Sequence, residues 1–170
     1  MSLECLFHHR YELAYFVPPG GTAIELGVAT GEFSATLLAT NPEIRTLYSI
    51  DRWADHHSLE EMAQAHDRLD AFGTRSVIIR STFAKAVFLF DRESSDLIYI
   101  DGYAHTGQEG GQTLRDWWPI VKPGGVLSGH DYDLKFSATV DAVDAFVMRH
   151  GLDLCCTTDD HYASWWVRKP

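Results

Sequence analysis

Short apolar runs alternate with amphipathic segments along this chain, and the alternation predicts its fold. A short apolar run bounded by turn residues is typical of a strand that is buried on both faces of a sheet. Five such strands are expected, at Thr22–Leu26, Thr46–Ile50, Val77–Ile79, Asp96–Asp101 and Val126–Asp131. Strands that alternate with helical segments form a parallel sheet, and the helices pack on both of its faces.

Helices are expected wherever apolar residues recur three and four positions apart. Ser58 and Glu61 match a capping box, which predicts that a helix begins after Ser58. Gly151 predicts the end of the last long helix, because glycine readily adopts the left-handed conformation of a C-terminal cap. The expected helices cover residues 1–19, 32–39, 59–69, 83–88, 108–118, and 140 to the cap at 151.

Two further strands close the chain, near Leu152–Cys156 and Ala163–Val167, and a short turn separates them. They must pair antiparallel, because a parallel pair would need a crossover of about a dozen residues. Neighbouring side chains on a strand point to opposite faces of the sheet. One ring of Trp165-Trp166 should therefore point inward and one outward, and packing in the core is the favoured role. An outward ring could instead contact a second copy in a homodimer or line a ligand pocket.

The whole chain, residues 1–170, is therefore expected to form one doubly wound, Rossmann-like α/β domain. Its sheet should be seven-stranded and mostly parallel, with an antiparallel last strand and helices on both faces. The domain divides into an N-terminal helix (1–19), a ligand-binding core (22–132), and a C-terminal helix with its strand pair (133–170).

The charge balance disfavours a nucleic-acid partner, because 24 acidic residues face 14 basic ones and the formal net charge is −10. No apolar run approaches the ~20 residues that a membrane helix needs, so no membrane association is expected. The N-terminus lacks the basic start and apolar centre of a secretory signal, which makes the cytoplasm the expected location.

Polar side chains gather at the predicted carboxyl ends of the strands, where doubly wound sheets bind their ligands. The chain after the first strand follows the pattern Glu25-x-Gly27-x-x-x-Gly31. Gly27 permits a sharp turn, and Gly31 lets a ligand lie against the start of the next helix. Asp51 follows the second strand, twenty residues after Gly31, at a place where an acid can hold both hydroxyls of a ribose.

The glycine spacing argues against a dinucleotide ligand. A pyrophosphate-binding loop prefers Gly-x-Gly-x-x-Gly, whereas this chain has Ala29 at the second glycine and Glu32 near the third. A glutamate at the start of a helix repels phosphate but tolerates a cationic, phosphate-free ligand. A nicotinamide-dependent oxidoreductase is therefore the weaker alternative.

Four segments carry sequence motifs in a fixed order. They are Ile24-Glu25-Leu26-Gly27-Val28-Ala29-Thr30-Gly31, Ser49-Ile50-Asp51-Arg52-Trp53, Asp96 to Gly102 with His105, and Lys122 to Leu127 with His130-Asp131-Tyr132. Together they resemble the motifs of class I S-adenosylmethionine-dependent methyltransferases. The last two are similar to those of a subgroup that includes small-molecule O-methyltransferases of natural-product and sugar pathways.

This resemblance implies S-adenosylmethionine as the cofactor and assigns residues to it. The residues that would cradle its methionine part are Glu25, Gly27, Ala29, Thr30 and Gly31. Asp51 would hold the ribose of the cofactor. Asp101 would also contact the cofactor. Those that would border the adenine are Arg52, Trp53, Ser81 and Thr82, although relatives often have an acid where this chain has Ser81.

Two routes for activating the methyl acceptor are open. His105 follows the acid of the fourth strand and is the candidate general base, because the ordinary pKa of histidine, near ~6.5, suits neutral pH. Asp101 is the second catalytic candidate. Alternatively, a divalent metal ion could orient the acceptor, as in related metal-dependent enzymes, with Asp101, His130 and Asp131 as ligands. His130 would favour manganese, iron, nickel or zinc over magnesium.

These expectations combine into one function, the S-adenosylmethionine-dependent methylation of a small molecule, most simply at oxygen. The alternative from another class is a catalytically inactive protein that binds S-adenosylmethionine in regulation or scaffolding. It stays open because the chain has no insertion after the fifth strand to build an acceptor pocket. The pair His56-His57 lacks a third partner at ligand spacing and is expected at the surface or at the end of a helix.

Overall fold

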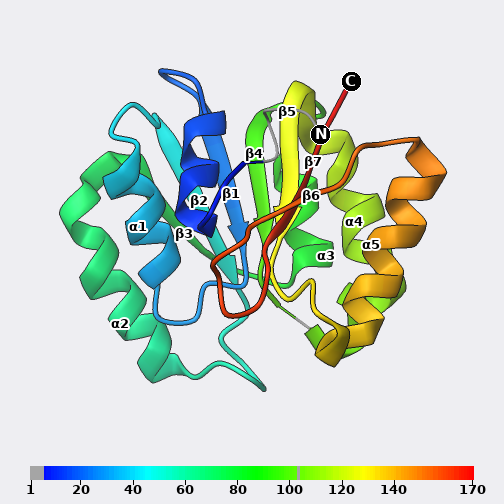
Figure 1. The fold of residues 1–170 in the computed structure, drawn as a ribbon. Coiled ribbons are helices and arrows are strands. Elements are labelled where there is room, and N and C mark those ends of the chain that lie inside the picture. Colours follow the sequence, from blue (N-terminus) through cyan, green and yellow to red (C-terminus); the bar gives the residue numbers. More distant parts are fainter. Residues whose placement is uncertain (1–5, 103) are drawn as a thin grey trace.

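A seven-stranded sheet forms the centre of the computed structural model, which describes residues 6–102 and 104–170 (Figure 1). The strands lie in the order β3-β2-β1-β4-β5-β7-β6. Their bounds are β1 (Thr22–Leu26), β2 (Thr46–Asp51), β3 (Ser76–Arg80), β4 (Ser95–Ile100), β5 (Val121–Gly129), β6 (Cys155–Cys156) and β7 (Trp165–Arg168). The first five strands are parallel, and β7 runs antiparallel to both of its neighbours. The predicted sheet is confirmed.

Helices cover both faces of this sheet. The α-helices are α1 (Glu32–Thr40), α2 (Leu59–Leu69), α3 (Phe83–Ala86), α4 (Gly107–Trp117) and α5 (Ser137–His150). The 3-10 helices are η2 (Arg10–Phe16), η3 (Asp70–Arg75), η4 (Val87–Leu89), η5 (Ala104–Thr106), η6 (Trp118–Ile120) and η7 (Leu134–Phe136). In Figure 1, α1 and α2 lie to the left of the sheet, whereas α4 and α5 lie to its right. None of the described helices is long and apolar enough to cross a membrane.

Two hydrophobic clusters fill the space between the sheet and its two helical layers. Leu13, Leu37 and Leu69 bring η2, α1 and α2 onto one face. On the other face the cluster takes its residues from α3, α4 and α5, and includes Leu114 and Phe146. Successive residues of the central strands alternate between the two clusters, so β1 and β4 are buried on both sides. This arrangement explains why the strands are continuous apolar runs in the sequence.

The N-terminal segment is shorter than the predicted helix over residues 1–19, of which residues 1–5 lie outside the described part of the chain. Its helical part is the 3-10 helix η2, which begins at Arg10. The carboxylate of Glu12 accepts hydrogen bonds from the backbone amides of His8 and His9, at 2.7 and 2.8 Å. These bonds cap the helix at His9 and prevent it from extending upstream.

Both tryptophans of β7 pack in the core, as favoured, and neither ring points outward. Trp165 and Trp166 are 0% and 2% exposed, because both faces of the sheet are covered. Trp165 belongs to the cluster beneath α3, α4 and α5. Trp166 packs against the rings of Phe7 and Phe16, with centroid distances of 5.4 and 6.3 Å. The homodimer therefore stays a prediction, and neither tryptophan of β7 supports it.

Candidate active site

The turn after β1 lies directly against the end of β4, and Gly27 makes this contact possible. Gly27 has a φ of 93°, and its amide donates a hydrogen bond to the carbonyl of Ile50 at 2.9 Å. The amide of Asp101 in turn donates to the carbonyl of Leu26 at 2.7 Å. An ideal Cβ on Gly27 would lie 2.6 Å from the carbonyl carbon of Asp101, closer than any side chain can approach. Only glycine fits this position.

The carboxylate of Asp51 holds this turn from the neighbouring strand. Its Oδ2 accepts hydrogen bonds from the backbone amides of Val28 and Ala29, at 2.8 and 3.0 Å. Its Oδ1 accepts one from the amide of Trp53 at 2.8 Å. Burial alone would raise the pKa of Asp51, but hydrogen bonds from His57 and these amides outweigh it and lower that pKa. Asp51 is therefore ionised at neutral pH.

His57 is a second partner of Asp51, and it lies at the end of a helix, directly before Ser58, which caps α2. Its Nδ1 lies 2.6 Å from Oδ2 of Asp51. The pKa of His57 is raised, chiefly by this hydrogen bond, although partial burial acts in the opposite direction. The sequence carries no signal for the pairing, because an acid and a histidine six residues apart in a loop form no recognisable motif.

Trp53 supports the turn from behind. Its indole is 1% exposed and packs in a small cluster with Val28 and Ala65. Its Nε1 donates a hydrogen bond to the carbonyl of Ala29 at 2.8 Å. The ring therefore stabilises the glycine-rich turn, and Trp53 does not line the cavity beside that turn.

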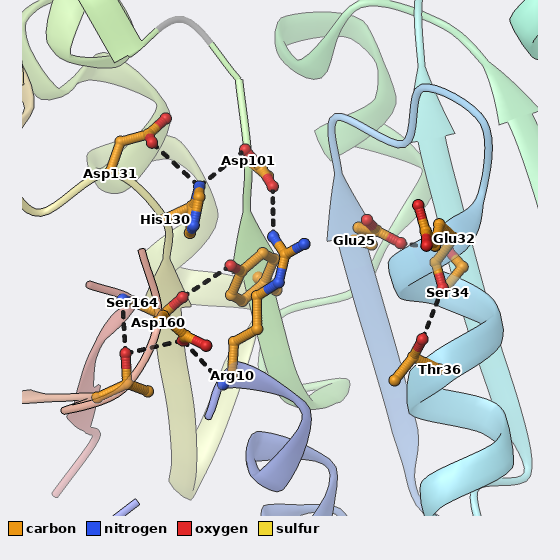
Figure 2. A network of polar contacts seen from close by, with 12 residues as sticks. Arg10, Glu25, Glu32, Ser34, Thr36, Asp101, His130, Asp131, Asp160 and Ser164 are labelled. Atoms are coloured by element: carbon orange, nitrogen blue, oxygen red, sulfur yellow. Dashed lines mark hydrogen bonds and ion pairs between the residues drawn. The ribbon is translucent and has the colours of Figure 1, made fainter. Parts of the chain in front are cut away.

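Glu25, the first acid of the motif, lies beneath the turn with 1% of its surface exposed. The hydroxyl of Ser34 on α1 donates a hydrogen bond to it (Figure 2). This hydroxyl also lies 2.6 Å from that of Ser49. Burial raises the pKa of Glu25 to about 8, even though the Ser34 hydrogen bond favours the ionised form. The free protein therefore carries a protonated carboxyl group at this position at neutral pH.

This raised pKa predicts a pH-dependent effect of Glu25→Gln on stability. The folded chain keeps the proton of Glu25 up to about pH 8, whereas the unfolded chain loses it near pH 4.5. The contribution of Glu25 to stability therefore falls as pH rises between these values. Glutamine cannot ionise, so the variant does not suffer this loss. The difference in free energy of unfolding, variant minus wild type, should therefore increase by about 2.5 kcal/mol from pH 5 to pH 7. Urea unfolding across this range measures the difference, and parallel curves would contradict it.

A second polar group lies at the ends of β4 and β5 (Figure 2). His130 Nδ1 is 3.0 Å from Oδ1 of Asp131 and 3.7 Å from Oδ1 of Asp101. Burial lowers the pKa of His130, but the hydrogen bond to Asp131 and the charge of Asp101 outweigh it and raise that pKa. Burial also raises the pKa of Asp101, against the opposing charges of His130 and Arg10. One atom from each of the residues Asp101, His130 and Asp131 lies within 4.8 Å of the others, close enough to share one metal ion.

Arg10 reaches this group from η2, and sequence reasoning missed it. Its guanidinium donates a hydrogen bond to Oδ2 of Asp101 at 3.1 Å. The guanidinium also lies 4.7 Å from the centre of the Phe33 ring. The backbone amide of Arg10 donates a hydrogen bond to Asp160 at 2.9 Å. Figure 2 shows Arg10 rising from the helix toward Asp101. The two residues are 91 positions apart, so no local pattern could have indicated the pair.

A cavity of about 340 Å³ lies in front of the turn and between these two groups. Its volume falls in the range of small-molecule sites. The predicted site residues that line it are Gly27, Asp51, Arg52, Thr82, Asp101, His105 and Asp131. Those that do not line it are Glu25, Ala29, Thr30, Gly31, Trp53, Ser81 and His130. The lining residues that sequence reasoning missed are Ala54, His56, His57, Phe83, Gly102 and Thr106.

The charges of the cavity suit a cationic ligand better than a phosphate. Asp51, Asp101 and Asp131 contribute carboxylates to its wall. Glu32 stands in the first turn of α1, where a dinucleotide-binding protein would present amides to a pyrophosphate. The site can therefore bind a ribose and a positive charge, and it repels a pyrophosphate at the usual place.

The chain is similar to one protein family and to several solved structures. A family model described as a methyltransferase domain matches residues 24–132. A solved structure from Corynebacterium glutamicum is similar with a TM-score of 0.73 and 18% identity, covering 94% of this chain and 77% of that one. A candidate O-methyltransferase from Klebsiella pneumoniae is similar with a TM-score of 0.71 and 16% identity, covering 94% of this chain and 78% of that one. A candidate caffeoyl-CoA O-methyltransferase from Staphylococcus aureus is similar with a TM-score of 0.68 and 15% identity, covering 87% of this chain and 76% of that one. No curated protein matches the chain.

Proposed function

The chain belongs to the Methyltransf_24 family of methyltransferase domains, and we propose that it transfers a methyl group from S-adenosylmethionine to an oxygen atom of a small molecule. The observation that carries this proposal is the place of Asp51, which lines the cavity while the turn after β1 is hydrogen-bonded to its carboxylate. The similarity to structures described as O-methyltransferases supports oxygen as the accepting atom.

The residues around the cavity fit this cofactor. Gly27 lines the cavity without a side chain, because the backbone carbonyl of Asp101 takes the place of a Cβ. The carboxylates of Asp51, Asp101 and Asp131 favour a ligand that carries a sulfonium and an ammonium group. We assign the ribose to Asp51 and the adenine side to Arg52 and Thr82, which line the same cavity. The bound cofactor supplies a methyl group that its positively charged sulfur makes electrophilic.

His105 is assigned as the general base. It lines the cavity together with Asp101 and Asp131, and its ring meets that of Phe136 edge-on at 5.4 Å. This contact restrains the imidazole of His105, which is exposed. From there it can accept the proton of an acceptor hydroxyl as that oxygen becomes methylated. Asp101 can hold the resulting imidazolium by its negative charge.

The same side of the cavity could instead hold a divalent ion between Asp101, His130 and Asp131. One nitrogen and two carboxylate ligands suit manganese, iron or zinc. Such an ion would orient and activate the acceptor oxygen. It would also have to displace the contacts that Arg10 and His130 make with the carboxylates. We therefore prefer His105 as the activating group.

Calorimetric titration tests the proposed cofactor. The protein is titrated with S-adenosylhomocysteine and, as the control, with NAD. Saturable binding of S-adenosylhomocysteine without a response to NAD supports the proposal, and the reverse pattern would contradict it. A library of hydroxylated small molecules, incubated with a methyl-labelled donor, then identifies the acceptor.

Replacing His105 by alanine is expected to lower the rate of methyl transfer about 100-fold, because a general base contributes at least that much. The affinity for S-adenosylhomocysteine should change little, since His105 lies on the acceptor side of the assigned ribose contact. His66→Ala, an exposed change on α2, is the matched control. Full activity of the His105 variant, together with wild-type activity that is lost on chelation and restored by Mn²⁺, would assign the step to the metal instead.

A further inference from the structure

Asp51 has too few free acceptor positions to bind both hydroxyls of a ribose. An ionised carboxylate offers about four lone-pair positions on its two oxygens. Oδ2 already accepts hydrogen bonds from Val28, Ala29 and His57, and Oδ1 accepts one from Trp53. Oδ2 is therefore saturated, and Oδ1 keeps about one position. A second group must serve the other hydroxyl.

His57 has a nitrogen in the right place for this role. Its side chain lines the cavity and is 28% exposed, whereas that of Asp51 is 6% exposed. Nδ1 must donate to Asp51, because an ionised carboxylate can only accept. Nε2, on the far side of the ring, has no hydrogen-bond partner among the residues described. It can accept from a hydroxyl when the ring is neutral and donate to one when the ring is protonated.

The loop that carries His57 is fixed on both sides. The guanidinium of Arg52 pairs with Asp55 at 2.8 Å. Directly after His57, the amide of Ser58 donates to Glu61 at 2.6 Å, and the amide of Glu61 donates to the Ser58 hydroxyl at 3.2 Å. His57 therefore stands between an ion pair and a capping box. Its ring is held beside Asp51 before any ligand arrives, which lowers the entropy cost of binding.

We propose that His57 is the second ribose-binding residue, and that it shares the two ribose hydroxyls of the cofactor with Asp51. Asp51 accepts from one hydroxyl through Oδ1, and Nε2 of His57 bonds to the other. The assignment rests on the proposed function, because it needs an adenosyl ligand in this cavity. It replaces the usual expectation that one carboxylate holds both hydroxyls.

Two substitutions separate this role from a purely structural one. The amide nitrogen of asparagine can take the place of Nδ1, so His57→Asn can keep the bond to Asp51 while removing the far nitrogen. The amide of glutamine reaches the place of Nε2, so His57→Gln can still meet the ribose. His66→Ala on the exposed side of α2 is the control for a histidine outside the cavity.

The experiment is calorimetric titration of these variants with S-adenosylhomocysteine and with its 2′-deoxy and 3′-deoxy analogues. The wild type should bind both analogues about tenfold more weakly than the parent. His57→Asn should bind the parent about tenfold more weakly and should no longer discriminate against one of the two analogues, because the partner of that hydroxyl is gone. His57→Gln should keep the discrimination.

Each outcome decides a different statement. If His57→Asn binds the parent as tightly as the wild type does, or weakens all three ligands equally, His57 acts only through Asp51 and the proposal is overturned. Circular dichroism and thermal melting of each variant show that the change is not unfolding. If the wild type does not bind S-adenosylhomocysteine at all, the proposed function fails, and the assignment of His57 fails with it.

Discussion

Replacing Gly27 by alanine is expected to destabilise the protein by more than ~4 kcal/mol, a loss seen only when a substitution cannot be accommodated. The new methyl group would collide with the carbonyl group of Asp101, which is backbone and cannot move aside as a side chain can. Moving it would break the hydrogen bond from Asp101 to Leu26 that joins the ends of β1 and β4. These are the two central strands between which the cavity opens.

Gly20→Ala is the matched control for this prediction. Gly20 has a φ of 73°, so alanine there bears a similar backbone strain, but no atom lies within 4 Å of its Cβ position. The two variants therefore differ in the collision alone. Urea unfolding should show a loss of about 1 kcal/mol for Gly20→Ala. An equally small loss for Gly27→Ala would show that the ends of β1 and β4 are not in contact as described.

Replacing Asp51 by alanine is expected to abolish binding of S-adenosylhomocysteine and to cost about 4 kcal/mol of stability. The amides of Val28, Ala29 and Trp53 would lose their acceptor, and each unsatisfied buried donor costs about 1–3 kcal/mol unless water reaches it. His57 would lose its partner as well. The turn that faces the cavity would then lose the acceptor that holds its amides, so ligand binding and stability should fall together.

Asp51→Asn makes this prediction more specific. An amide keeps one acceptor oxygen but places an NH2 group where donors already point, so it can satisfy only some of the four contacts. Its stability should lie between that of the wild type and that of Asp51→Ala, with cofactor binding weakened at least tenfold. Asp67→Ala, an exposed change on α2, serves as the control. Unchanged affinity in Asp51→Ala would contradict both the ribose assignment and the proposed function.

The electrostatics of the site come from both ends of the chain. Arg10 of η2 pairs with Asp101, and Asp160, which follows β6, accepts a hydrogen bond from the backbone of the same arginine. The charge of Asp101, at the end of β4, is thereby partly neutralised before any ligand binds. A cationic cofactor and a base such as His105 can then share one small cavity without an excess of negative charge.

Much of the fold could be predicted from the sequence because its signals are local. Apolar runs, the Ser58 capping box and the Gly151 cap each depend on residues a few positions apart, and the structure confirms the helix that begins after Ser58 and the one that ends before Gly151. The same holds for Gly27 and Asp51, because a parallel sheet brings the carboxyl ends of adjacent strands to one edge. Both residues line the cavity.

The remaining features depended on contacts between distant segments, which only the tertiary structure decided. Arg10 meets Asp101 because η2 packs on the same face of the sheet as α1, and Trp166 is buried for the same reason. The indole of Trp53 packs behind the turn, where it donates a hydrogen bond to the carbonyl of Ala29. His57 is hydrogen-bonded to Asp51. Periodicity determines which residues face the core, but the partner of a polar side chain depends on which groups folding brings within hydrogen-bond distance.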